Sequence, residues 1–272
     1  MVPPAASTAS RIRATNRRAS VGSSSAPSAS TSADVSQFVI VTNPVERVKF
    51  SIISKAVVPD VALIDPETTM TMDPFLSACT GIDAMVHAIE AFVSTGAGPL
   101  TDMHAVDAMR LINTNIAQLV ANPADIHLRE KIMLGSMKAG LAFSNAILGA
   151  VHAMSHSLGG YLDLPHGLCN AILLEHVIGY NFPEAPERFK VVAETLDIDT
   201  RGLTNKQIQT RLIDRVVNLK RQVGLTQKLA QNGVNISDIP ILSDHALQDP
   251  CILTNPRKSN KRDVETVYEE AL

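Results

Sequence analysis

Aromatic residues are scarce in this sequence. Its 272 residues include no Trp, 3 Tyr and 7 Phe, so aromatic side chains make up only 4% of the chain. Sheet-rich proteins draw on aromatic and β-branched residues, whereas Ala, Leu and Met favour helices. The composition therefore predicts a mainly helical protein, and the length is enough for one or two domains with a buried core.

Cysteines are also few. Cys79, Cys169 and Cys251 are widely spaced and form no C-x-x-C pair. This spacing excludes a zinc ribbon and a dithiol redox motif. We expect a reducing compartment, in which the three cysteines serve as small core residues.

An excess of one charge and long apolar runs are missing as well. The 24 basic and 27 acidic residues give a net charge of −3, which argues against a nucleic-acid-binding surface. No run approaches the roughly 18 to 20 consecutive apolar residues of a membrane span. We therefore expect no nucleic-acid partner and no insertion into a membrane.

Acidic residues are absent from the first 33 positions. This stretch is rich in Ser, Ala, Thr and Pro, and it carries four arginines, Arg11, Arg13, Arg17 and Arg18. Such a segment buries too little apolar surface to fold, and its composition is also typical of an organellar transit peptide. We expect residues 1–34 to be a disordered low-complexity or transit-like segment of a cytoplasmic or mitochondrial protein. The apolar core of a secretory signal is lacking, so secretion is not expected.

The remaining chain divides into a short β part and a long helical part. Residues 37–64 hold three runs rich in Val, Ile and Phe, which predict two or three short strands. Within residues 80–94, apolar side chains recur at helical spacing and predict an amphipathic helix that ends near Gly96. Helical patterning continues to the C-terminus and predicts seven to nine helices. The expected breaks are at residues 122–123, 159–160, 163–165, 181–186, 197–202 and 255–256.

Several common catalytic motifs are absent. The sequence has no G-x-S-x-G elbow, no P-loop and no H-E-x-x-H pair. Its G-x-G, at residues 96–98, follows a helix rather than a strand and lacks the third glycine of a dinucleotide fingerprint. We interpret this stretch as a loop.

Asp83 and His87 form the first candidate constellation. They are four residues apart on the predicted helix, so both side chains project from one edge of it. This spacing suits two ligands of one metal ion, and it equally suits an ordinary pair on a helix surface.

A second constellation holds three histidines within fifteen positions. His152 and His156 share a helix face, and the glycines and proline that follow allow the chain to bring His166 back towards them. These histidines could be satisfied polar groups at a helix end. Together with Asp83 and His87, they could instead form a site for Fe²⁺ or Zn²⁺. The histidines far from both clusters are interpreted as structural or surface residues: His104, His127, His176 and His245.

At these residues the sequence resembles the iron-containing (group III) alcohol dehydrogenases. The resemblance rests on three segments and looks continuous from about residue 35 to the C-terminus. The segments are TGIDAMVHAIEAFVS (residues 80–94), AGLAFSNAILGAVHAMSHSLGGYLDLPHGLCNAILLEHV (139–177) and DHALQDPCILTNPR (244–257).

The resemblance implies a fold and a set of site residues. Residues 71–272 would form the family's all-helical metal-binding domain, and residues 35–70 would be remnant strands of the cofactor domain. The metal ligands would be Asp83, His87, His152 and His166. His156 would relay the alcohol proton, and Lys49 would approach the ribose of the cofactor.

One departure from the family pattern bears on activity. The GGGS phosphate loop and the TTAGTGSE-like segment of the family are not found ahead of residue 35. Backbone N–H groups at such a loop bind the pyrophosphate of a dinucleotide. We therefore expect weak or no dehydrogenase activity from this chain alone.

Three functions follow as hypotheses. The first is an iron-dependent alcohol dehydrogenase that converts a small primary alcohol into an aldehyde and passes hydride to NAD(P). The alternative is a non-catalytic helical protein for metal binding or oligomerisation, derived from that family. A metal-dependent lyase or hydrolase related to dehydroquinate synthases is weaker, because no phosphate-binding residues are found. The family favours Fe²⁺ over Zn²⁺, and a second copy of the chain is an expected partner.

Overall fold

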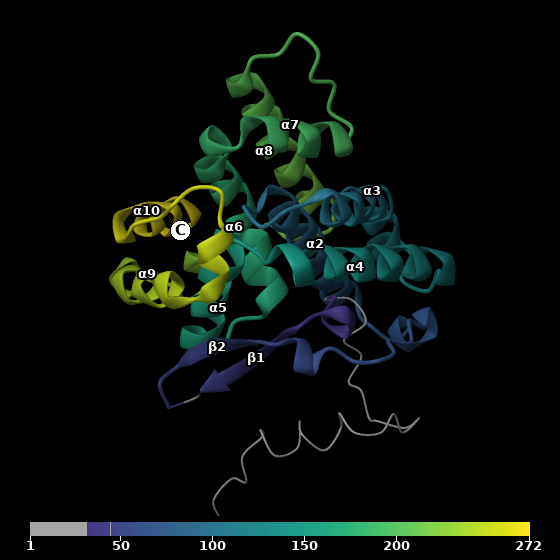
Figure 1. Ribbon diagram of the computed structural model, residues 1–272, viewed down its shortest axis with the longest axis horizontal. Coiled ribbons are helices and arrows are strands. Elements are labelled where there is room, and N and C mark those ends of the chain that lie inside the picture. The colour runs from purple at the N-terminus through teal and green to yellow at the C-terminus, as the bar shows by residue number, and fades with distance from the viewer. Residues whose placement is uncertain (1–31, 44) are drawn as a thin grey trace, which may run out of the picture.

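The computed structural model describes residues 32–43 and 45–272, and these residues form a helical bundle with a β-hairpin along one edge (Figure 1). The predicted mainly helical fold is confirmed. The expectation of a disordered or transit-like segment falls mostly on residues 1–31, outside the described part. The α-helices are α2 (Pro74–Val93), α3 (Pro99–Ala121), α4 (Ile126–Ala146), α5 (Ala150–Leu162), α6 (His166–Asn181), α7 (Pro186–Thr195), α8 (Asn205–Gln222), α9 (Ile239–Gln248) and α10 (Lys261–Ala271).

Among the described residues two strands form, within the predicted two or three. β1 (Phe38–Asn43) and β2 (Val48–Ile53) pair antiparallel, with Phe38 opposite Ile53. The third apolar run, at residues 61–64, lies in an irregular segment instead. Leu63 in that run is exposed, and the run pairs with neither strand of the hairpin in the described part of the chain.

The helix predicted from residues 80–94 is α2, and it is not amphipathic. Asp73 caps its N-terminus by accepting a hydrogen bond from the backbone N–H of Leu76, and Pro74 occupies the first turn. Every residue from 77 to 93 is buried, because α3, α4, α6 and α7 all pack against α2. By length and composition α2 could cross a membrane, but 89% of its apolar window is buried inside the protein. The burial in the core accounts for its apolar character.

A sharp bend that the sequence pattern did not predict separates α4 from α5. The two helices meet at 101°. Ile147 at the bend has φ 65°, a left-handed conformation that is costly for a β-branched residue. The bend turns α5 across the bundle, and its histidines thereby face α2.

The break predicted at Gly159 and Gly160 is wrong, because α5 continues through both glycines to Leu162. A Cβ atom on Gly160 would lie 2.6 Å from the backbone N of Lys49 and 2.8 Å from Cα of Val48. The glycines therefore do not end the helix. They allow β2 to lie directly against it. The other predicted breaks fall between helices or at a helix end.

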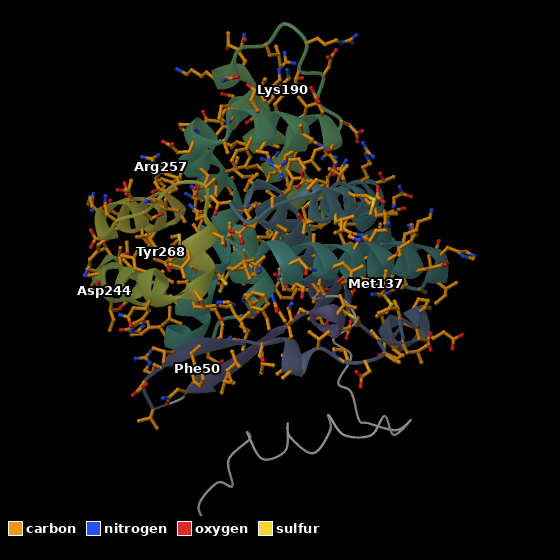
Figure 2. The ribbon with its side chains drawn as sticks, in the orientation of Figure 1. Phe50, Met137, Lys190, Asp244, Arg257 and Tyr268 are labelled. Atoms are coloured by element: carbon orange, nitrogen blue, oxygen red, sulfur yellow. The ribbon has the colours of Figure 1, made fainter. Side chains whose placement is uncertain are left out.

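The C-terminal helices close the bundle around α5. Tyr268 on α10 is buried, and its hydroxyl donates a hydrogen bond to the carbonyl of Met154 on α5 at 2.8 Å (Figure 2). α9 packs against both α5 and α10. The division of the chain at residue 70 into two parts stays a prediction.

Candidate metal centre

Three helices bring three predicted ligands together. Oδ1 of Asp83 on α2 lies 3.5 Å from Nε2 of His152 on α5 and 3.7 Å from Nε2 of His166, the first residue of α6. α6 can begin this close to α2 because Gly167 has no Cβ, which would lie 2.4 Å from the carbonyl oxygen of Cys79. The three side chains therefore converge on one point inside the bundle.

His87, the fourth predicted ligand, lies beside this group and not within it. Its ring stacks on the ring of His152 at 4.3 Å between centroids and on Phe143 at 4.4 Å. Burial lowers the pKa of His87 to about 3, which keeps the imidazole neutral. His87 lines the same cavity as the three converging residues.

A cavity of about 230 Å³ opens at these residues. His156 and the four predicted ligands form its polar wall. Its apolar wall is formed by Phe38, Ile40, Phe143 and Leu148. A small molecule with one polar end and a short carbon chain would match these two walls.

Glu90 contacts Nδ1 of His152, the ring nitrogen that does not face Asp83. Its Oε2 lies 2.6 Å from Nδ1 of His152, and its Oε1 accepts the backbone N–H of Val151 at 2.6 Å. Burial lowers the pKa of His152, but the hydrogen bonds to Asp83 and Glu90 outweigh it and raise the pKa to about 9. A carboxylate behind a ligating histidine fixes the ring so that the other nitrogen faces the ion.

The donor set fits a divalent ion. Burial raises the pKa of Asp83, and the neighbouring histidines, His87 first, lower it further than burial raises it, so the carboxylate stays ionised. Its Oδ2 is buried and has no hydrogen-bond partner among the described residues. Donor atoms 3.5 and 3.7 Å apart can share an ion at about 2.1 Å from each. One carboxylate with several imidazoles suits Fe²⁺ or Zn²⁺.

Asn170 also belongs to this site, and the sequence analysis missed it. Its side-chain Nδ2 donates a hydrogen bond to Oδ1 of Asp83 and lies 3.2 Å from Nε2 of both His152 and His166. The residue is fully buried. It lies one helical turn after His166, and this spacing was the available signal.

His156 lies between the first cavity and a second one of about 300 Å³. Lys49 on β2 lines the second cavity. Its approach to the ribose of a cofactor stays a prediction. His245 lines it too, although the sequence analysis treated this residue as structural or surface, because α9 returns beside α5. Asp249 follows α9 and places its Oδ2 2.7 Å from Nδ1 of His156.

Cys251 lies close enough to His156 and Asp249 to suggest a second metal site. Two observations favour a hydrogen-bonded pair instead. The imidazole and the carboxylate are already in direct contact at 2.7 Å. Burial, together with Asp249, raises the pKa of the Cys251 thiol well above its ordinary value, which disfavours the thiolate that a metal needs. All three cysteines are buried and free, as predicted for core residues.

Comparison with known proteins identifies the family. Residues 77–272 match the model of the Fe-containing alcohol dehydrogenase family, C-terminal. The chain is 39% identical over 243 residues to 1,3-propanediol dehydrogenase of Citrobacter freundii, covering 89% of this chain and 63% of that protein. It is 36% identical over 243 residues to lactaldehyde reductase of Escherichia coli (strain K12), with the same coverage.

Solved structures agree with the sequence comparison. The crystal structure of 1,3-propanediol oxidoreductase superposes with a TM-score of 0.86 at 38% identity, covering 90% of this chain and 64% of that one. An alcohol dehydrogenase from Oenococcus oeni superposes with a TM-score of 0.87 at 35% identity, with the same coverage. The chain thus spans just under two thirds of the length of these relatives. With its helical fold and its converging histidines, the chain belongs to the Fe-containing alcohol dehydrogenase family.

Proposed function

We propose that this chain binds one Fe²⁺ ion through Asp83, His87, His152 and His166 and that the site serves an alcohol dehydrogenase reaction. The convergence of a buried carboxylate and two imidazoles on one point carries this proposal. The buried Oδ2 of Asp83 has no hydrogen-bond partner among the described residues, which is costly, and a bound ion would compensate this charge. His87, which lines the same cavity, would complete the set.

The surrounding residues fit the chemistry of an alcohol. A bound metal supplies Lewis acidity, which favours the alkoxide form of an alcohol. His156 lines the same cavity and would accept the hydroxyl proton. Phe38, Phe143 and Leu148 would hold the carbon chain and exclude water. Lys49, in the adjoining cavity, would contact the ribose of NAD(P).

The substrate class follows from the cavity and from the relatives. A cavity of about 230 Å³ suits a small primary alcohol or aldehyde. Relatives are named for 1,3-propanediol, lactaldehyde and methanol, and the methanol dehydrogenase is described as NAD-dependent. We extend this class of substrate and the use of NAD(P) to this chain. A second copy as partner, and a cytoplasmic or mitochondrial location, remain predictions.

Metal analysis after anaerobic loading with Fe²⁺ tests the site. The wild-type chain should retain one iron, and His152→Ala and His166→Ala should retain almost none, because each removes a nitrogen from the point of convergence. His127→Ala is the matched control, since the side chain of His127 is 82% exposed and lies in the first turn of α4, whereas Phe143 of the cavity lies in the last turn. Iron retained equally by all variants would refute the ligand assignment.

Calorimetric titration of NAD⁺ into the iron-loaded chain tests the reaction class. Binding in the micromolar range would support a dehydrogenase and justify an assay with short primary alcohols. One iron per chain without measurable NAD⁺ binding would favour the alternative, a non-catalytic metal-binding protein derived from the family. His156→Ala should leave the iron content unchanged, and loss of iron in this variant would make His156 a ligand.

A further inference from the structure

Asp249 uses both of its carboxylate oxygens on fixed partners. Oδ1 accepts the backbone N–H of Cys251 at 2.8 Å, and Oδ2 lies 2.7 Å from Nδ1 of His156. Asp249 and His156, which we call the dyad, both have buried side chains. Asp249 begins a 3-10 helix, Pro250–Thr254, and its contact with Cys251 is the cap of that helix. The carboxylate is therefore held in place independently of His156.

This contact determines which nitrogen of His156 carries the proton. Burial raises the pKa of Asp249, but the hydrogen bond to His156 and other contacts outweigh it and lower the pKa, so the group is an ionised carboxylate. An ionised carboxylate only accepts hydrogen bonds. Nδ1 of His156 must therefore be the donor, and in the neutral ring Nε2 keeps its lone pair.

The position of His156 makes this tautomer useful. Its ring lines both cavities and stacks on the ring of His166 at 5.2 Å between centroids. Asp249, in contrast, lines only the second cavity. Nε2 is the one nitrogen of His156 that is left for a molecule bound next to the metal ligands.

We propose that Asp249 is a positioning residue that holds His156 in the Nδ1–H tautomer, so that Nε2 is available to accept the proton of an alcohol in the first cavity. That the proton comes from an alcohol rests on the proposed function. The tautomer of His156 rests only on its contact with Asp249.

Asp249→Asn separates this role from a purely structural one. The backbone N–H of Cys251 can only donate, so the amide oxygen must remain on it. The amide NH₂ then faces Nδ1 of His156, and an NH₂ group can only donate. Nδ1 must become the acceptor, and the proton moves to Nε2. The variant keeps the shape and the helix cap of Asp249 while it reverses the tautomer.

Long-range ¹H–¹⁵N NMR of the full chain with ¹⁵N-labelled histidine reports the protonation of each ring nitrogen. The resonances of His156 are assigned by their loss in His156→Gln. We expect the Nδ1–H form in the wild type and the Nε2–H form in Asp249→Asn. The matched control is Asp244→Asn, because Asp244 lies at the outer edge of α9, half exposed and paired with Lys261 (Figure 2). It should leave the His156 signals unchanged.

Two results would overturn the proposal. One is a wild-type His156 with its proton on Nε2, which can be read even where the Asn variant does not fold. The other is the same tautomer in the wild type and in folded Asp249→Asn. Metal content is measured on the same samples and should not change in Asp249→Asn. A wild-type chain that binds no metal yet shows the Nδ1–H form would refute the proposed function and leave the inference on Asp249 standing.

Discussion

Replacing Glu90 by Gln should weaken metal binding although Glu90 is not itself a predicted ligand. Oε1 of Glu90 accepts the backbone N–H of Val151, and Oε2 contacts Nδ1 of His152, each at 2.6 Å. Gln has one oxygen for these two positions. If the oxygen stays on Val151, the NH₂ group faces Nδ1 of His152 and drives the ring proton to Nε2, where the metal should bind.

The expected loss of metal affinity follows from the hydrogen bond that the variant must give up. To bind an ion through Nε2 of His152, the side-chain amide of the Glu90→Gln variant has to turn and leave the N–H of Val151 without an acceptor. Both groups are buried, and a buried unsatisfied donor costs about 1 to 3 kcal/mol. Since about 1.4 kcal/mol corresponds to a factor of ten, the affinity should fall about 5- to 150-fold. Loss of a partner behind a metal-ligating histidine typically costs about 10- to 100-fold.

Anaerobic competition of the chain with a chelator for Fe²⁺ measures this affinity. Glu130→Gln is the matched control, because the side chain of Glu130 is 68% exposed and pairs only loosely with His127. It should bind Fe²⁺ as the wild type does. An affinity of Glu90→Gln within twofold of the wild type, in a chain that remains folded, would refute the role of Glu90 in orienting His152.

Two further predictions concern packing. Gly160→Ala should destabilise the chain by about 1 to 3 kcal/mol in urea unfolding, because its Cβ would lie 2.6 Å from the backbone N of Lys49. Gly179→Ala inside α6, whose Cβ would come no closer than 3.7 Å to a neighbouring side chain, should not lower the free energy of unfolding, and equal losses in the two variants would contradict the close approach of β2. The three buried thiols, Cys79, Cys169 and Cys251, should not react with Ellman's reagent at pH 8 until the chain unfolds. Burial raises the pKa values of Cys79 and Cys169 to about 12, which disfavours the reactive thiolate. Rapid reaction of the native chain would contradict the burial of these thiols.

Local sequence patterns determined most of the helix boundaries. Pro and Asn end α3 and start the turn before α4, and the run from Asn181 to Pro186 separates α6 from α7. These residues act through their own backbone, so no distant contact is needed to recognise them. The same holds for the spacing of four residues between Asp83 and His87 and between His152 and His156, which places each pair on one helix face.

Where sequence reasoning failed, the cause was a contact between distant segments. Gly159 and Gly160 have the local pattern of a helix break, yet they lie inside α5 because β2 approaches them. The apolar periodicity of α2 indicated one buried face, whereas helices from the rest of the chain bury all of them. The bend at Ile147 has no turn-forming residue at the position with positive φ.

The sequence by itself determined the helical class and the residue types of a metal site. Only the tertiary structure decided which groups support those residues. Glu90 is separated from His152 by 62 positions, and Asp249 from His156 by 93. A hydrogen bond depends on distance in space, and this distance is set by how the helices pack. The contacts that hold the two histidine rings are therefore a property of the packed bundle.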